Sequence, residues 1–410
     1  MSGSHNLKTI ELDLSTFTKE RLITAAFNTA YDLNMPVALW RMPEQTEVNL
    51  VVSTEGSKLL AKIDLEELSN GFIFSPFNYG EQPAHFIEGD FSLSFDFEEV
   101  IHNNTNEEKS DSENLRKFRN HFIDLLSEST NVTNYHINPS AVTESSVDYL
   151  ELVGQCLSAI AEGHFEKVVP ARAKSIPLEE SFDPFSLFFD LADNYPSAFV
   201  SFVSIPEQGT WIGATPEMLI EKSGNSFKTV ALAGTQPFDA EKSMGETAWT
   251  QKEIEEQAMV SRYIINCFKK IRLREYVEVG PKTAKAGNLL HLKTTYNVDT
   301  KATNFPELAT TMLDLLHPTS AVAGMPKEGT IDYLSTHEGL NRDFFSGFLG
   351  PVNFEQKSNL FVNLRCMQLL NNKAMLYAGA GVTSDSNPEK EFLETESKFN
   401  TLLNVLNKSK

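Results

Sequence analysis

Apolar residues recur along this chain with two different spacings, and both are visible in its first hundred residues. A helical spacing over TKERLITAAFNTAYDL (18–33) predicts an amphipathic helix, whereas VALWRM (37–42) and VNLVVS (48–53) predict strands. The polar, acidic stretch HNNTNEEKSDSENLRK, which begins at His102, predicts a flexible surface loop. Because apolar periodicity resumes directly after it, this stretch indicates a loop rather than a linker between domains.

The pattern becomes denser from Val147 onward, where strand-like runs closed by Gly, Pro and Thr turns follow one another. Helices are predicted over 147–163, over about 250–270, and from near Asn387 to the end. The predicted strands lie in 165–176, 198–204, 209–222, 227–237, 288–298, 347–354, 360–370 and 373–383. Consecutive strands with a few long helices predict an α+β fold with antiparallel sheets rather than a parallel βαβ array.

Composition restricts the possible partners. The chain has 410 residues, of which 41% are hydrophobic, enough for one large domain or two smaller ones. A formal net charge of -21 argues against nucleic acid and anionic membranes as partners. Cys156, Cys267 and Cys366 have no metal-binding spacing and no even pairing, which predicts a reducing cytoplasm. We find no signal peptide, membrane span, repeat or coiled coil, and expect a monomer.

Two matching pairs of glutamates are the strongest chemical signal. Glu253 and Glu256, like Glu391 and Glu394, are spaced i, i+3, so each pair shares one face if its segment is helical. Four converging carboxylates would repel one another unless a hard cation lay among them, and oxygen-only ligation suits Mg²⁺. The alternative is that both are solvated faces of acidic helices.

Lys167 and Glu217 are candidates for proton transfer. In a strand, Lys167 shares a face with Val169. A lysine that faces a sheet interior is costly unless it is paired or deprotonated, and desolvation favours the neutral amine that a general base needs. Glu217 follows a Gly/Thr/Pro turn and could be a general acid if it is buried. The alternatives are an edge-strand lysine that faces water and a glutamate in the first turn of a helix.

Tight glycine turns follow two predicted strands. Gly234 and Thr235 lie in ALAGTQP, and Gly379, Ala380 and Gly381 lie in YAGAGV. Such backbone can approach a ligand closely and offer N–H donors to a carboxylate, although glycine after a strand is usually only a turn.

Two polar side chains interrupt apolar strands. A buried guanidinium such as that of Arg365 needs an anion, either a ligand carboxylate or one of the glutamates. His291 lies in LLHLKTTY, where it could line a site or be a satisfied core residue.

Ten of these motifs occur in the order typical of chorismate-utilising enzymes, and the chain resembles that family from about Val147 to Leu406. The motifs are FEKVVPAR, WIGATPEMLIEK, ALAGTQP, KEIEEQAMV, HLKT, LHPTSAVAGMPK, RDFFSGFLG, LFVNLRC, LYAGAGV and EKEFLETESK. Each motif is weak alone, but ten in order are a strong signal. The resemblance implies one large α+β domain with two antiparallel sheets packed as a sandwich and helices outside. Residues 1–145 would be its variable N-terminal part, and 146–410 the catalytic core.

The resemblance also implies a magnesium site. Glu256 and Glu394 would bind Mg²⁺ directly, with Glu253 and Glu391 acting through water molecules. The metal would hold the ring carboxylate of chorismate, and Lys398 would lie close to both.

The remaining candidates take roles in binding and chemistry. Lys167 would activate the water that attacks C2 of chorismate, and Glu217 would protonate the departing C4 hydroxyl. Arg365, with backbone around Gly379 to Gly381, would hold the enolpyruvyl carboxylate. Two further residues would line the pocket: Thr235 and His291.

A few positions discriminate among the members of this family. Aminating members usually carry Gln in the place of Lys167, and the aminodeoxychorismate type often has a nucleophilic lysine where Ala233 stands here. Phe345 occupies a position that is usually Tyr in salicylate synthases. Pro170 and Ala171 depart from the Leu-Ser that is commoner in isochorismate synthases.

These positions favour the isochorismate synthases, whose products serve menaquinone or siderophore biosynthesis. The expected activity is a reversible, Mg²⁺-dependent conversion of chorismate to isochorismate. The alternatives are a salicylate synthase, which also eliminates pyruvate, an aminating enzyme and a non-catalytic chorismate-binding relative.

Overall fold

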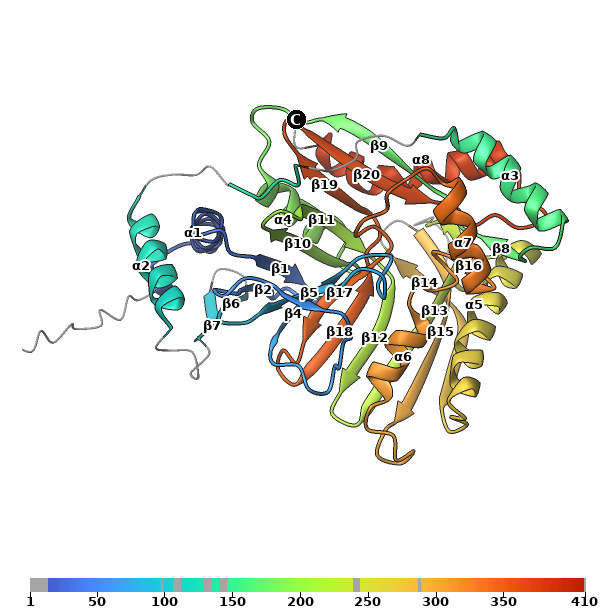
Figure 1. Cartoon of the computed structure of the whole chain (residues 1–410), viewed down its shortest axis with the longest axis horizontal. Helices are drawn as coiled ribbons and strands as arrows, with labels where there is room; N and C mark the ends of the chain where they lie inside the picture. Colours follow the sequence, from blue (N-terminus) through green and yellow to red (C-terminus); the bar gives the residue numbers. More distant parts are fainter. Residues whose placement is uncertain are drawn as a thin grey trace, which may run out of the picture.

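Two nine-stranded antiparallel sheets form the body of the molecule, which is a single α+β domain in the computed structural model (Figure 1). The structure describes residues 14–96, 99–105, 112–128, 134–139, 146–238, 244–286 and 289–408. The first sheet has the order β7 (Glu99–Thr105), β6 (Phe91–Asp96), β2 (Val48–Val52), β1 (Val37–Arg41), β10 (Phe199–Ile205), β11 (Gly209–Thr215), β19 (Cys366–Leu370), β20 (Lys373–Gly379), β9 (Ala171–Pro177).

The second sheet has the order β14 (Val277–Ala286), β15 (Leu289–Asp299), β13 (Ser226–Pro237), β12 (Met218–Ser223), β18 (Lys357–Val362), β17 (Phe348–Val352), β4 (Gly71–Ser75), β5 (Ala84–Glu88), β3 (Lys58–Leu60). Two short strands, β8 (Lys167–Val168) and β16 (Gly324–Met325), pair beside them. Strands from before residue 146 join both sheets, since β1 pairs with β10 and β4 with β17.

Helices cover the outer faces of the sandwich. The first sheet packs against α1 (Lys19–Asp32), α2 (Glu113–Ser127), α4 (Pro184–Asn194) and α8 (Pro388–Leu406). The second packs against α5 (Gln251–Lys270) and α6 (Leu308–Leu316), whereas α3 (Tyr149–Ala161) and α7 (Lys327–His337) lie over the short strands.

The central strands of the first sheet, such as β1, β10 and β11, are buried on both faces, which explains their nearly continuous apolar sequences. In β1, Leu39 belongs to the outer core with α1, whereas Trp40 points to the inner core between the sheets. There the Trp40 ring lies 5.3 Å from that of Phe72 in the opposite sheet. The predicted α+β sandwich is therefore confirmed.

Three predicted strands are broken, and all three breaks lie near the candidate active site. The strand expected over 209–222 divides at Pro216 and Glu217 into β11 and β12, which belong to different sheets. The strand expected over 165–176 divides into β8 and β9, because the backbone of Lys167 and Val168 pairs with β16 and Pro170 has no N–H to donate. The strand expected over 360–370 divides into β18 and β19. Arg365 lies in this break with φ +48, so the expectation that it sits inside a strand was wrong.

The predicted surface loop from His102 is shorter than expected. Its first residues continue β7 to Thr105, and its last residues begin α2, whose N-terminus is capped by the Ser112 hydroxyl. Residues 106–111 lie outside the described part of the chain.

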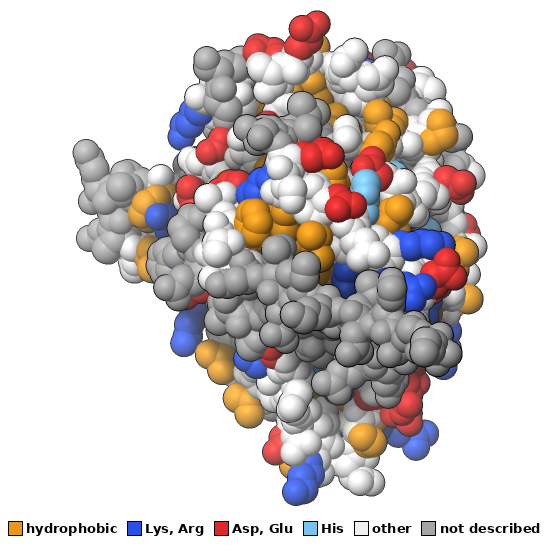
Figure 2. All heavy atoms as spheres, turned by 90° about the vertical axis from the view of Figure 1, so that its left-hand side faces the viewer, with side chains coloured by type: hydrophobic (Ala, Val, Ile, Leu, Met, Phe, Trp, Pro, Cys, Tyr) orange, Lys and Arg blue, Asp and Glu red, His pale blue; other side chains and the backbone are white. Residues whose placement is uncertain are grey.

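The surface gives no evidence of a membrane-spanning helix. No helix within the described ranges is both long and apolar enough to cross a bilayer. On the face shown in Figure 2, acidic and basic side chains are interspersed with small apolar groups.

Candidate active site

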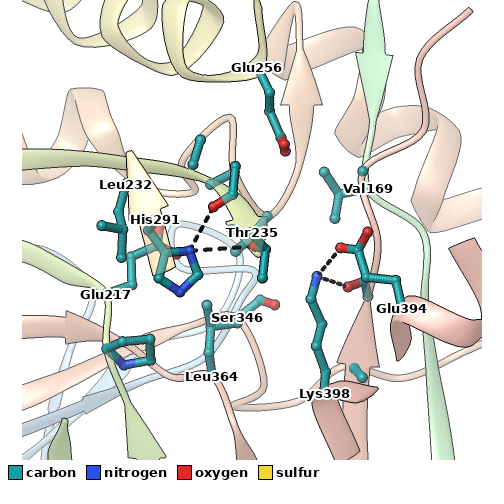
Figure 3. Close-up of a pocket in the computed structure, with 18 of the residues that line it drawn as sticks. Val169, Glu217, Leu232, Thr235, Glu256, His291, Ser346, Leu364, Glu394 and Lys398 are labelled. Atoms are coloured by element: carbon teal, nitrogen blue, oxygen red, sulfur yellow. Dashed lines mark hydrogen bonds and ion pairs between the residues drawn. The ribbon is translucent and has the colours of Figure 1, made fainter. Parts of the chain in front are cut away.

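A cavity of about 260 Å³ opens where the two sheets meet α5 and α8 (Figure 3). Most of the predicted site residues line it: Glu217, Gly234, Thr235, Glu253, Glu256, His291, Arg365, Gly379, Gly381, Glu394 and Lys398. Lys167 and Glu391 do not line the cavity but bond to the lining residues Glu256 and Lys252. Ala380 lies in the chain between Gly379 and Gly381. The predicted residues that line the cavity come from seven separate motifs of the sequence, and Lys167 comes from an eighth.

Lys167 is buried, with 2% of its surface exposed, so the interpretation as a water-facing lysine was wrong. Its Nζ donates to Glu256 Oε1 at 2.9 Å. Burial acts to raise the pKa of Glu256, but the charge and hydrogen bond of Lys167, with Lys398 and Lys252, lower it to about 2. Glu256 is therefore ionised at neutral pH and fixes the position of the Lys167 amine.

Glu217 lies at the corner between β11 and β12, so it is not in the first turn of a helix. Burial in the cavity raises its pKa to about 7, although the Thr319 hydroxyl and the charge of Arg365 oppose this shift. The Thr319 Oγ1 lies 3.4 Å from Glu217 Oε1. A carboxyl with this pKa is partly protonated at neutral pH and can donate a proton.

His291 on β15 faces a β-bulge in β13 at Gly234 and Thr235. Its Nδ1 lies 2.8 Å from the Gly234 carbonyl and 3.4 Å from Thr235 Oγ1. Burial lowers the pKa of His291 to about 4, so the ring is neutral and Nδ1 carries the proton donated to the carbonyl. Its Nε2 is buried and, among the described residues, has no hydrogen-bond partner. This nitrogen can accept a hydrogen bond from a ligand.

Arg365 reaches the cavity from the break between β18 and β19. Burial lowers its pKa, and the carboxylates of Glu394 and Glu217 oppose this effect. No ion pair joins its guanidinium to a glutamate within the described part of the chain, so the alternative of an Arg–Glu pair does not hold there. A partly buried guanidinium without a carboxylate partner is suited to bind a ligand anion.

The glycines after β20 serve close packing. Ala380 N–H already donates to the Pro170 carbonyl at 3.2 Å, so it is engaged within the protein. A Cβ on Gly381 would lie only 2.8 Å from Lys167 Cε. Gly381 therefore leaves the room in which the Lys167–Glu256 pair sits.

The two glutamate pairs do lie on helices, at the N-terminal ends of α5 and α8. Glu253 forms a capping box with Thr250, whose N–H donates to Glu253 Oε2 at 2.8 Å. In Figure 3 the Glu256 carboxylate points into the cavity, and Glu394 pairs with Lys398 at 2.7 Å. Glu391 is buried and pairs with Lys252 at 3.1 Å.

The donor chemistry of these four carboxylates fits a hard divalent cation, because oxygen ligands are what Mg²⁺ prefers. In the described residues, however, no three metal-binding side chains are grouped closely enough to hold an ion as they stand. Lys167, Lys252 and Lys398 each hold one of the carboxylates instead.

Two residues that contact the predicted site residues, Lys252 and Thr319, were not predicted from the sequence. Lys252 stands one helical turn before Glu256, a spacing that could have indicated it. Partial burial acts to lower the pKa of Lys252, but Glu391, with Glu394 and Glu256, raises it. Thr319 gave no local signal, since it meets Glu217 across 102 residues of chain.

Comparison with known proteins gives one consistent result. The model of a family described as chorismate binding enzyme matches residues 93–407. The isochorismate synthase EntC of Escherichia coli K12 is 28% identical over 284 residues, which cover 68% of this chain and 71% of that protein. The isochorismate synthase DhbC of Bacillus subtilis is 29% identical over 286 residues, covering 66% and 70%.

Solved structures agree on the fold. The menaquinone-specific isochorismate synthase MenF of Escherichia coli superposes with a TM-score of 0.73 at 19% identity, covering 93% of this chain and 91% of that one. Anthranilate synthase component I of Streptococcus pneumoniae superposes with a TM-score of 0.66 at 18% identity, covering 98% and 95%.

Proposed function

The chain belongs to the family of chorismate-binding enzymes, and from that premise we propose that it is an isochorismate synthase. It converts chorismate reversibly to isochorismate by adding water at C2 and losing the C4 hydroxyl. Water is a poor nucleophile and hydroxide a poor leaving group, so the reaction needs both a base and an acid. The observation that carries the proposal is that the carboxyl of Glu217, with a pKa of about 7, and Glu256, which holds the buried amine of Lys167, line one cavity.

Lys167 is the base in this mechanism. Once the ammonium group paired with Glu256 has released a proton, the resulting amine takes a proton from the water that forms the new C2–O bond. Glu256, which accepts a hydrogen bond from Lys167 Nζ at 2.9 Å, orients the amine and stabilises the ammonium that results. As electrons shift through the ring, the C4–O bond breaks.

Glu217 is the acid, and it gives its proton to the departing C4 hydroxyl, which leaves as water. In Figure 3, Glu217 and Glu256 approach the cavity from different sides, which suits an acid and a base that act at two ring positions. The proton taken up by Lys167 and the proton lost by Glu217 balance, so the net reaction is an isomerisation. Each positioned group contributes about 10²- to 10⁴-fold in rate.

Substrate binding uses the charges around the cavity. Arg365 binds the enolpyruvyl carboxylate, with help from backbone near Gly379 and Gly381. The unpartnered Nε2 of His291 accepts a hydrogen bond from a substrate hydroxyl, and Thr235 lines the cavity beside it.

We further propose that Mg²⁺ is the cofactor. Glu256 and Glu394 would hold it directly, and Glu253 and Glu391 would act through water. When bound, it neutralises the ring carboxylate of chorismate among these glutamates. Lys398, which donates to the Gly379 carbonyl at 2.7 Å, positions the Glu394 carboxylate.

Phe345 favours this activity over salicylate formation. Its ring stacks on that of Tyr377 at 5.4 Å and presents no hydroxyl to the cavity. The buried, unpaired state of the three cysteines supports a cytoplasmic enzyme. We propose that the enzyme acts as a monomer. Its elution volume in gel filtration would test this proposal.

The decisive experiment incubates the purified protein with chorismate and Mg²⁺ and resolves the products by chromatography, with and without EDTA. We expect an isochorismate peak that disappears with EDTA. Salicylate plus pyruvate would place the enzyme among the salicylate synthases, and absence of turnover would favour a non-catalytic chorismate-binding protein. Isochorismate that persists in EDTA would refute the metal requirement alone.

A further inference from the structure

Lys252 bridges the two helices that carry the glutamates. It lies in the first turn of α5, and its Nζ donates to Glu391 Oε1 on α8 at 3.1 Å, across 139 residues of chain. Lys252 also lines a second cavity of about 560 Å³, which shares Glu256 and Gly381 with the first. The lysine therefore lies at the boundary between the two cavities.

The ammonium group of Lys252 is surrounded by carboxylates, as a bound cation would be. The carboxylates of Glu391, Glu394 and Glu256 all act on its ammonium group. Without a cation, these carboxylates would repel one another at the ends of α5 and α8. Lys252 thus supplies positive charge in the place where the proposed function requires the metal.

Of the three lysines that pair with these glutamates, Lys252 can move away from its carboxylate partner most easily. Its side chain is 47% exposed, whereas that of Lys167 is 2% exposed and that of Lys398 is 17% exposed. A long, flexible lysine stem can turn its ammonium into water at little cost. The less exposed Lys167 and Lys398 have no comparable position in water for their ammonium groups.

We propose that Lys252 is a tethered cation that neutralises the α5–α8 carboxylates in the metal-free protein and is displaced from Glu391 when Mg²⁺ binds. This inference rests on the proposed metal site. Two consequences follow from the exchange. Lys252 stabilises the metal-free protein, and it weakens metal binding because the incoming ion must compete with it.

The test is a calorimetric titration of Mg²⁺ into the protein without substrate, which measures metal binding independently of activity. In Lys252→Met, which keeps the length of the stem and removes the charge, we expect Mg²⁺ to bind about tenfold more tightly. In EDTA this variant should melt at a lower temperature than the wild type, and Mg²⁺ should raise its melting temperature by more. Lys252→Arg, which keeps the charge, should bind Mg²⁺ as the wild type does.

Lys174 offers a matched control. Its Nζ pairs with Glu396 on the same helix α8 at 2.8 Å, with 35% of its side chain exposed, but it lies outside both cavities. Lys174→Met should leave the affinity for Mg²⁺ unchanged.

The outcomes separate this inference from the proposed function. Unchanged or weaker Mg²⁺ binding in Lys252→Met, with binding by the wild type, would overturn the exchange but keep the metal site. A wild-type protein that binds no Mg²⁺ would overturn the metal site and the exchange with it. Equal tightening in Lys174→Met would show a general charge effect and would also overturn the role of Lys252.

Discussion

Replacing Gly381 with alanine adds one methyl group at the point where the Lys167–Glu256 pair is packed. The new Cβ would lie 2.8 Å from Lys167 Cε, 3.3 Å from Nζ and 3.5 Å from Glu256 Oε1. The first contact is about 0.7 Å inside the ~3.5 Å at which two carbon atoms pack favourably. Because Lys167 is 2% exposed, its stem has little free space into which it can move.

We therefore expect Gly381→Ala to affect activity more than folding. Overpacking of this kind costs about 1–3 kcal/mol of unfolding free energy. A shift of the Lys167 amine by a large fraction of an ångström would lower the rate by about 100-fold, since catalytic geometry tolerates little displacement. The assay compares kcat for isochorismate formation with the thermal unfolding of the same preparation.

Gly154→Ala provides the control. It adds the same methyl group in the middle of α3, where nothing lies within 4 Å of the new Cβ. It should stabilise the protein by about 1 kcal/mol, because alanine is the better helix former, and leave kcat unchanged. A Gly381→Ala enzyme with wild-type kcat would refute the role assigned to the packed Lys167–Glu256 pair.

Three other substitutions test single groups of the site. Glu217→Gln should lower kcat by about 10²- to 10⁴-fold. The wild-type rate should fall as the pH rises through about 7, where the acid loses its proton, and this decline should be absent from the residual pH–rate profile of the variant. Because the pKa of Glu256 in the folded protein is about 2, below its ordinary value of 4.5, its pairing with Lys167 stabilises the protein above about pH 4.5 and is lost as the pH falls toward 2. Thermal melts in EDTA between pH 5 and 3 should therefore show a smaller acid destabilisation for Glu256→Gln than for the wild type, and equal losses would contradict the assignment. Arg365→Lys keeps the charge but loses the planar fork, so KM for chorismate should rise by at least tenfold, about 1.4 kcal/mol, and an unchanged KM would exclude carboxylate binding there.

Most strands could be predicted because their signal is local. Runs such as 198–204 and 373–383 are apolar on both faces and end at turn residues, which correspond to β10 and β20. The three breaks could not be predicted, because each depends on pairing with distant parts of the chain. Lys167 and Val168 leave the first sheet to pair with Gly324 and Met325, and this pairing has no counterpart in the local pattern.

In the candidate site, too, local spacing predicted some features, whereas contacts between distant segments could not be predicted. Spacing alone placed Glu253 with Glu256, and Glu391 with Glu394, on helix faces, because the helical repeat is a local property. The partners of these carboxylates come from other segments of the chain. Lys252 meets Glu391 only because α5 and α8 approach one another in the folded domain.

The glutamate pairs illustrate what an acidic cluster in a sequence can predict. Converging carboxylates require positive charge, but spacing does not determine whether an ion or a side chain supplies it. Here Lys167, Lys252 and Lys398 already pair with three of the four glutamates, so side chains supply positive charge to these three carboxylates. A bound ion then has to replace an existing partner rather than fill an empty site. The affinity for metal therefore depends as much on how easily a lysine is displaced as on the carboxylates themselves.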